Sequence, residues 1–62
     1  MTENVRVFIV EDDKDFIFLI KKMLEKQPEI EVIGSCSKKE EAVQMACALR
    51  PQIVIMDLNL GI

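Results

Sequence analysis

Acidic residues follow two apolar segments of this chain, and they are the side chains best suited to chemistry. Glu11 and Asp12 come directly after the apolar segment 5–10, and Asp57 comes directly after the apolar run 53–56. Carboxylate oxygens are ligands that Mg²⁺ prefers, and a carboxylate can also act as the nucleophile that forms an acyl phosphate. Whether these groups work together depends on whether the fold brings the ends of the two segments to one place.

Both apolar segments have the composition of buried strands. The run 53–56 is β-branched at three of its four positions, and it follows Pro51, which prevents a preceding helix from continuing. The segment 5–10 is also rich in β-branched residues, with one arginine near its start. Strands that are apolar on both faces occur in parallel sheets covered by helices, where binding sites lie beyond the carboxyl ends of the strands.

The segment between Asp13 and Pro28 has the spacing of an amphipathic helix. We predict a helix over about 14–27, with Asp12 or Asp13 as its N-cap and Pro28 marking its end. Apolar residues recur at intervals of three and four, and the predicted buried face consists of Phe16, Leu19, Ile20, Met23 and Leu24.

A weaker strand and a second helix follow. The strand over about 31–36 has a charged start, which is typical of a sheet edge, and Gly34 within it suggests a bulge or a close approach. Ser37 and Glu40 match a capping box, which predicts a helix over about 38–49. The predicted buried face of this helix consists of Ala42, Met45, Ala46 and Leu49.

The order strand, helix, strand, helix, strand predicts an α/β fold with a three-stranded parallel sheet. The first and third strands are the most apolar, so the spatial order 2-1-3 is expected, with one helix on each face. Glu11, Asp12 and Asp57 would then meet at one crevice, where their mutual repulsion is relieved by a cation or by a shared proton. Mg²⁺ is the cation that such a site favours.

Composition limits the alternatives. The 62 residues suffice for one domain, over 1–62, and the net charge of −3 argues against direct contact with nucleic acid or an anionic membrane. No apolar run is long enough to span a bilayer and no signal sequence precedes the first strand, so a cytoplasmic location is expected. Cys36 and Cys47 are expected to be reduced, apolar filling residues.

Two motifs at this spacing resemble the receiver domain of bacterial two-component response regulators. They are VRVFIVEDD, followed by the first helix, and IVIMDLNLG after the second. The resemblance implies a flavodoxin-like, doubly wound fold, of which this chain would form the first half. It also implies phosphoryl transfer to Asp57 from a sensor histidine kinase or a phosphotransfer protein, and hence a switch rather than an enzyme.

The resemblance also assigns a magnesium site. Asp12 and Asp57 would supply side-chain oxygens to the ion, Glu11 would act through a bound water, and Asn59 would contribute its backbone carbonyl. In this family the first helix contacts the phosphoryl donor. Ile17 and Phe18 lie beside the predicted buried face, so they either widen that face or form an apolar dock for the partner.

The chain departs from the family pattern in ways that predict impaired function. Gly61 and Ile62 stand where the family usually has proline and glycine, and the family's later hydroxyl residue and lysine have no counterpart. We therefore expect a truncated receiver that accepts phosphate poorly by itself. The strand over 53–56 would form an exposed apolar edge, which predicts self-association.

Two other interpretations stay open on the sequence alone. A magnesium-dependent phosphotransferase or nucleic-acid-cleaving domain also places acids after its first and third strands, although Asn59 and the acidic net charge argue against it. The chain could also be an inactive structural half-domain.

Overall fold

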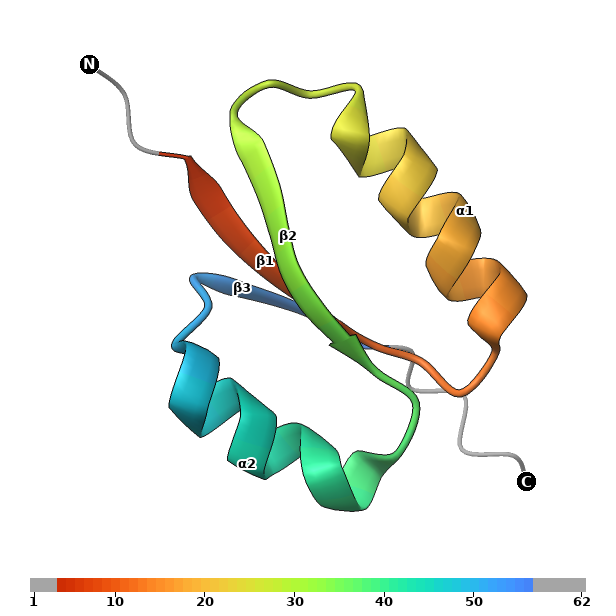
Figure 1. Cartoon of the computed structure of the whole chain (residues 1–62), viewed down its shortest axis with the longest axis vertical. Helices are drawn as coiled ribbons and strands as arrows, with labels where there is room; N and C mark the ends of the chain where they lie inside the picture. The colour runs from red at the N-terminus through yellow and green to blue at the C-terminus, as the bar shows by residue number, and fades with distance from the viewer. Residues whose placement is uncertain (1–3, 57–62) are drawn as a thin grey trace.

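The computed structural model describes residues 4–56, which form a parallel sheet with a helix on either side (Figure 1). In chain order the elements are β1 (Val5–Val10), α1 (Lys14–Glu25), β2 (Ile30–Cys36), α2 (Lys39–Leu49) and β3 (Ile53–Met56). The strands are parallel and lie in the order β2-β1-β3. The predicted α/β fold and its strand order are therefore confirmed.

The central strand β1 divides the core into two layers. Phe8 and Val10 point toward α2 and pack with Cys36 and Ala42. The alternate residues Val7 and Ile9 point toward α1 and pack with Ile17. Phe8 and Ile9 are completely buried. Because successive strand residues face opposite sides, this one apolar segment supplies the centre of both layers.

The pairing of β2 with β1 contains the irregularity that the glycine suggested. Val7 pairs with Val32 but Phe8 pairs with Gly34, so Ile33 is the extra residue of a bulge. A Cβ atom built on Gly34 would lie 3.0 Å from Leu49 Cδ1 and 3.5 Å from Phe8 Cδ1. The absence of a side chain here lets α2 approach the sheet closely.

The buried face of α1 differs from the prediction. Ile17 is buried, and Ile20 and Leu24 pack beside it, whereas Phe16, Leu19 and Met23 are 45%, 58% and 67% exposed. The helix packs mainly on β2 rather than on β3, so the side that turns toward β2 is the side that is buried. The predicted stripe was wrong for Phe16, Leu19 and Met23, because the spacing does not say which strand a helix covers.

The buried face of α2 agrees with the prediction, but its start does not. Ala42 is buried, and Met45, Ala46 and Leu49 pack against the same layer. The predicted Ser37 cap was wrong, because the helix begins at Lys39 and the residue in the cap position is Lys38, with no side-chain cap hydrogen bond. The backbone is still extended at Lys38, which leaves the Ser37 side chain one residue too early to cap the helix.

A short left-handed turn brings the chain from α2 to β3. Arg50, the C-cap of α2, has φ 52°, and its N–H donates to the Ala46 carbonyl at 2.9 Å. The N–H of Gln52 donates to the Arg6 carbonyl, and the Gln52 Oε1 atom accepts from the Arg6 N–H, each at 2.9 Å. This reciprocal pair sets the register of β3 against the start of β1.

The strand β3 is the least covered part of the sheet. Both helices pack over β2 and β1, and Ile53, Val54 and Met56 are 44–48% exposed. Within residues 4–56, no helix is both long enough and apolar enough to cross a membrane.

The central position of β1 gives a prediction for stability. Replacing Phe8 by alanine removes a fully buried ring, which should cost about 3–5 kcal/mol and leave so small a domain largely unfolded. The matched control is Phe18→Ala, at a ring that is 59% exposed and lies 5.3 Å from Lys22 Nζ, which should cost less than about 1 kcal/mol. Urea denaturation followed by circular dichroism measures both. Equal losses would contradict this description of the core.

Candidate functional site

The carboxyl ends of β1 and β3 lie level with each other. Val10 at the end of β1 pairs with Met56 at the end of β3. Beyond β1, the N–H of Glu11 donates to the Cys36 carbonyl at 2.9 Å, so Glu11 is also tied to the end of β2. Three strand ends therefore meet at one rim of the sheet, where parallel α/β folds bind their ligands.

Glu11 is held at this rim in a buried position. Its side chain is 7% exposed, and Oε1 accepts a hydrogen bond from the Asp13 N–H at 3.1 Å. A buried carboxylate is costly unless charge or hydrogen bonds compensate it. The bond to the backbone of Asp13 therefore orients the Glu11 carboxylate and stabilises the turn that leads into α1.

Asp13 is the N-cap of α1, one of the two residues predicted for that position. Its Oδ1 atom accepts from the N–H groups of Asp15 at 2.9 Å and Phe16 at 3.3 Å. These two bonds satisfy donors that the first turn of a helix leaves without an intrahelical partner. Asp12 lies exposed between Glu11 and this cap.

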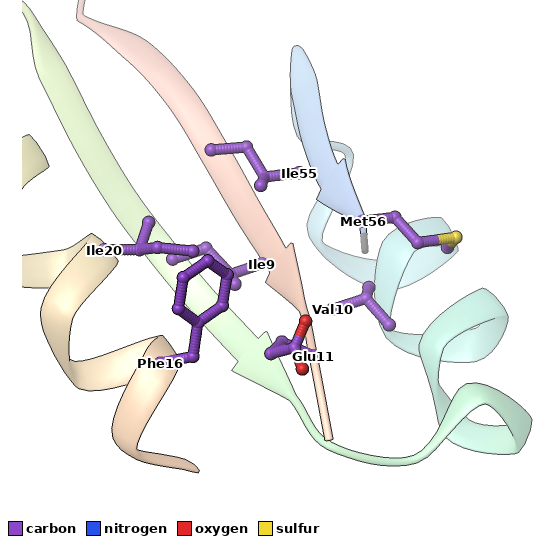
Figure 2. A pocket seen from close by; sticks show the side chains of 7 residues that line it. All are labelled: Ile9, Val10, Glu11, Phe16, Ile20, Ile55 and Met56. Carbon is purple, nitrogen blue, oxygen red and sulfur yellow. The ribbon is translucent and has the colours of Figure 1, made fainter. Parts of the chain in front are cut away.

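A cavity of about 270 Å³ lies beside Glu11, between the strand ends and α1 (Figure 2). Its walls come from β1, β3 and α1, and they consist of Ile9, Val10, Glu11, Phe16, Ile20, Ile55 and Met56. Apart from the Glu11 carboxylate these side chains are apolar, so the carboxylate is set in a largely apolar wall. The cavity borders the carboxyl ends of β1 and β3, where a crevice was predicted, but the predicted meeting of Glu11, Asp12 and Asp57 stays a prediction because Asp57 lies outside the described residues.

The predicted site residues are divided between described and undescribed parts of the chain. Glu11 and Asp12 lie at the rim, whereas Asp57 and Asn59 fall outside the described residues. Within residues 4–56, no group of three histidine, cysteine, aspartate or glutamate residues is arranged to hold a metal ion. The predicted metal set therefore has two members among the described residues.

The two residues predicted as a partner dock lie on different sides of α1. Ile17 is 7% exposed and packs in the core with Val7 and Ile9, so the structure corrects its assignment to an exposed dock. Phe18 is 59% exposed on the outer side of the helix, below the Lys22 ammonium group. A one-residue step along a helix turns the side chain by about 100°, which explains why Ile17 is buried while its neighbour Phe18 is exposed.

Comparison with known proteins gives one family. The family model described as response regulator receiver domain matches residues 7–61. No solved structure gives a significant match.

Curated relatives match nearly the whole chain but only a small part of their own length. The protein named protein-glutamate methylesterase/protein-glutamine glutaminase 2 from Methanospirillum hungatei is 38% identical over 56 residues, which is 90% of this chain and 16% of that protein. The similarly named protein from Alkalilimnicola ehrlichii is 41% identical over 57 residues, 92% of this chain and 15% of that protein. A third, from Geobacter sulfurreducens, is 37% identical over 59 residues, which is 95% of this chain and 16% of that protein.

The cap at Asp13 gives a prediction for the site's scaffold. Asp13→Ala removes the acceptor of both capping hydrogen bonds and should lower the free energy of unfolding by about 1 kcal/mol. Asp13→Asn keeps a carbonyl acceptor and should cost only a few tenths of a kcal/mol, as asparagine caps about as well as aspartate. Urea denaturation measures both variants. If the two losses were equal, the charge of Asp13 rather than its cap would be the stabilising feature.

Proposed function

Because this chain belongs to the response regulator receiver domain family, we propose that Asp57 accepts a phosphoryl group in a bacterial two-component pathway. The phosphoacceptor role in two-component regulation is the role of the family. The choice of Asp57 rests on its position directly after β3 in the sequence, in the IVIMDLNLG motif. This membership favours the receiver role over a magnesium-dependent phosphotransferase or nucleic-acid-cleaving domain.

The observation that best supports the proposal is the level pairing of the two strand ends. Val10 and Met56 are partners in the sheet, and the residues that follow them in the sequence are Glu11 and Asp57. The Glu11 carboxylate is held at this rim, so a ligand type that Mg²⁺ prefers lies next to the end of β3.

The donor set at the rim suits a hard divalent cation. We propose that Asp12 and Asp57 bind Mg²⁺ through side-chain oxygens, that Glu11 acts through a water molecule, and that Asn59 contributes its backbone carbonyl. Glu11 and Asp12 are carboxylates, the ligand type that Mg²⁺ prefers, and Asp12 is exposed and accessible. When bound, the ion would neutralise negative charge on the phosphoryl oxygens.

The proposed reaction moves one phosphoryl group without any external oxidant or reductant. An oxygen of the Asp57 carboxylate attacks phosphorus, and the bond from phosphorus to the donor histidine nitrogen breaks as the new P–O bond forms. The electron pair of the broken bond stays on the imidazole, which then takes up a proton. Asp57 becomes an acyl phosphate.

The proposed role is that of a switch and not of an enzyme with a separate substrate. The chain spans about 16% of the curated relatives' length, so the activity in their names is not assigned to these residues. A sensor histidine kinase or phosphotransfer protein is the proposed donor, and the cytoplasm is the proposed location. Impaired phosphorylation, self-association at the β3 edge and the lack of nucleic-acid contact stay predictions.

Of the two α1 residues predicted to contact the donor, Ile17 is buried and Phe18 is exposed, so Phe18 is the proposed contact. Its ring is 59% exposed and it lies on the side of α1 away from the core. Aromatic side chains, phenylalanine included, are enriched at the centres of protein interfaces.

Labelling by small phosphoryl donors tests the main proposal. In Mg²⁺, acetyl phosphate should add one phosphoryl group to a minor fraction of the chains, as impaired phosphorylation implies, detected by intact mass, and the Asp57→Asn variant should lose this addition. Asp12→Asn should lower the yield roughly tenfold or more because it removes a metal ligand. Asp15→Asn is the matched control at an exposed acid of α1 and should leave the yield unchanged. Phosphorylation that persists in Asp57→Asn would contradict the proposal.

Phe18 has its own test. Phe18→Ser should slow phosphoryl transfer from a phosphorylated histidine phosphotransfer domain roughly tenfold, a loss of about 1.4 kcal/mol of docking energy, and leave labelling by acetyl phosphate unchanged. Val43→Ser, at a residue 69% exposed on α2, is the control for a change of surface polarity. A parallel loss with both donors would mean that Phe18 supports the fold rather than the partner.

A further inference from the structure

A second cavity lies between the start of α1 and the end of β2, on the flank of the helix away from β3. Its volume is about 220 Å³, and it is lined by Lys14, Ile17, Ser35 and Ser37. Figure 1 shows the arrowhead of β2 and the start of α1 at the same end of the molecule. We call this cavity the β2 pocket.

The position of β2 makes this pocket independent of the uncovered β3 edge. The sheet order is β2-β1-β3, so β2 and β3 are at opposite edges. A flavodoxin-like sheet has the order 2-1-3-4-5, in which further strands are added beyond the third and the second stays at the edge. Further strands of such a fold therefore leave the β2 pocket accessible.

The bulge in β2 is what brings two serines into the pocket. Before the bulge, Val32 packs in the layer under α1. An unbroken strand would continue that face with every second residue from there on. The extra residue Ile33 shifts the alternation by one. Cys36 therefore packs under α2, and its neighbours Ser35 and Ser37 face the start of α1.

The polar groups of the β2 pocket are hydrogen-bond donors that suit an anion. The Lys14 ammonium group offers three donors and a positive charge, and the hydroxyl groups of Ser35 and Ser37 offer one donor each. Among the described residues, no carboxylate lines the pocket, and neither serine hydroxyl has a hydrogen-bond partner. The buried side chain of Ile17 forms an apolar wall, beside which less water screens the charge of Lys14.

The acids next to Lys14 in the sequence do not neutralise the pocket wall. Asp13 accepts hydrogen bonds from two N–H groups in the first turn of α1, so its carboxylate is engaged in capping the helix. Asp15 is one residue further along the helix than Lys14, which turns its side chain by about 100°. The charged group in the wall of the β2 pocket is therefore a cation.

We propose that the β2 pocket binds a phosphate group, with the Lys14 ammonium and the hydroxyls of Ser35 and Ser37 donating to its oxygens. Phosphate presents its oxygens in a tetrahedral arrangement, so that donors from α1 and from β2 can each meet a different oxygen. The volume of about 220 Å³ is many times the roughly 10–15 Å³ that one water molecule needs, so a phosphate ion fits. None of these residues belongs to the proposed magnesium site.

A titration with inorganic phosphate, followed by the backbone amide resonances, tests the proposal. It is run without Mg²⁺ and at constant ionic strength, so that a metal-bound phosphate and general screening do not contribute. The resonances of Lys14, Ser35 and Ser37 should shift along one saturable curve with a Kd of roughly 1 mM. If these resonances showed no saturable shift at about 50 times that concentration, the proposal would be overturned.

Matched variants separate the pocket from a general effect of charge. Lys14→Gln removes the positive charge of the wall and should raise the phosphate Kd roughly tenfold. The double variant Ser35→Ala, Ser37→Ala removes two neutral donors and should also raise it roughly tenfold. Lys26→Gln removes the same charge at the C-cap of α1, the other end of the helix, and should leave the Kd unchanged within about twofold.

The lysine pair alone decides the outcome if the serine variant does not fold. Lys14 and Lys26 are both exposed, so neither substitution disturbs the core, and circular dichroism checks that each variant is folded. Equal weakening by Lys14→Gln and Lys26→Gln would mean that phosphate responds to net charge and not to the β2 pocket, which would overturn the proposal.

Two further measurements identify the ligand and separate this site from the proposed phosphoacceptor. Acetate has fewer oxygens and less charge than phosphate, so it should bind at least roughly fivefold more weakly. Equal binding would overturn the assignment to phosphate. Asp57→Asn should leave the phosphate Kd unchanged within about twofold, whereas loss of binding would place the phosphate at Asp57 and overturn the proposal. Labelling by acetyl phosphate can fail while this titration succeeds, so the two proposals are tested independently.

Discussion

Parallel pairing of β1 on both of its edges is the constraint on which the rest of the structure depends. This strand bonds to β2 on one side and β3 on the other, while its side chains fill the layers under α1 and α2. No polar side chain fits between Val7 and Val10 without an unpaired group in a dry core. The first residue that can carry a charge is therefore the one at which the strand leaves the sheet, Glu11.

The acidic rim is a consequence of that constraint rather than a separate feature. Glu11 is anchored to Cys36 at the end of β2 and to the turn that starts α1, so its carboxylate is held by the same elements that build the core. Membership of the receiver domain family connects this rim with the proposed phosphoacceptor, Asp57, which follows β3 in the sequence.

The sequence alone predicted the features that follow from how apolar each segment is and from the spacing of its apolar residues. The strand order followed from β1 and β3 being more apolar than β2, and the buried face of α2 followed from its spacing. The buried face of α1 did not, because the spacing of apolar residues does not say which strand the helix covers, and burial went to the side nearest β2. The prediction of Ser37 as the cap of α2 was wrong because a capping motif does not show where the extended backbone before the helix ends. Asp57 and Asn59 lie outside the described residues, so their part of the site rests on the motif.

The central claim is that the acids after β1 and after β3 share one divalent ion. A titration with Mg²⁺ followed by the backbone amide resonances of Glu11, Asp12 and Asp57 tests it most directly. These three resonances should shift together along one saturable curve, and Asp12→Asn should raise the apparent Kd for Mg²⁺ reported by all three. Resonances that shift independently, or that do not saturate, would contradict it.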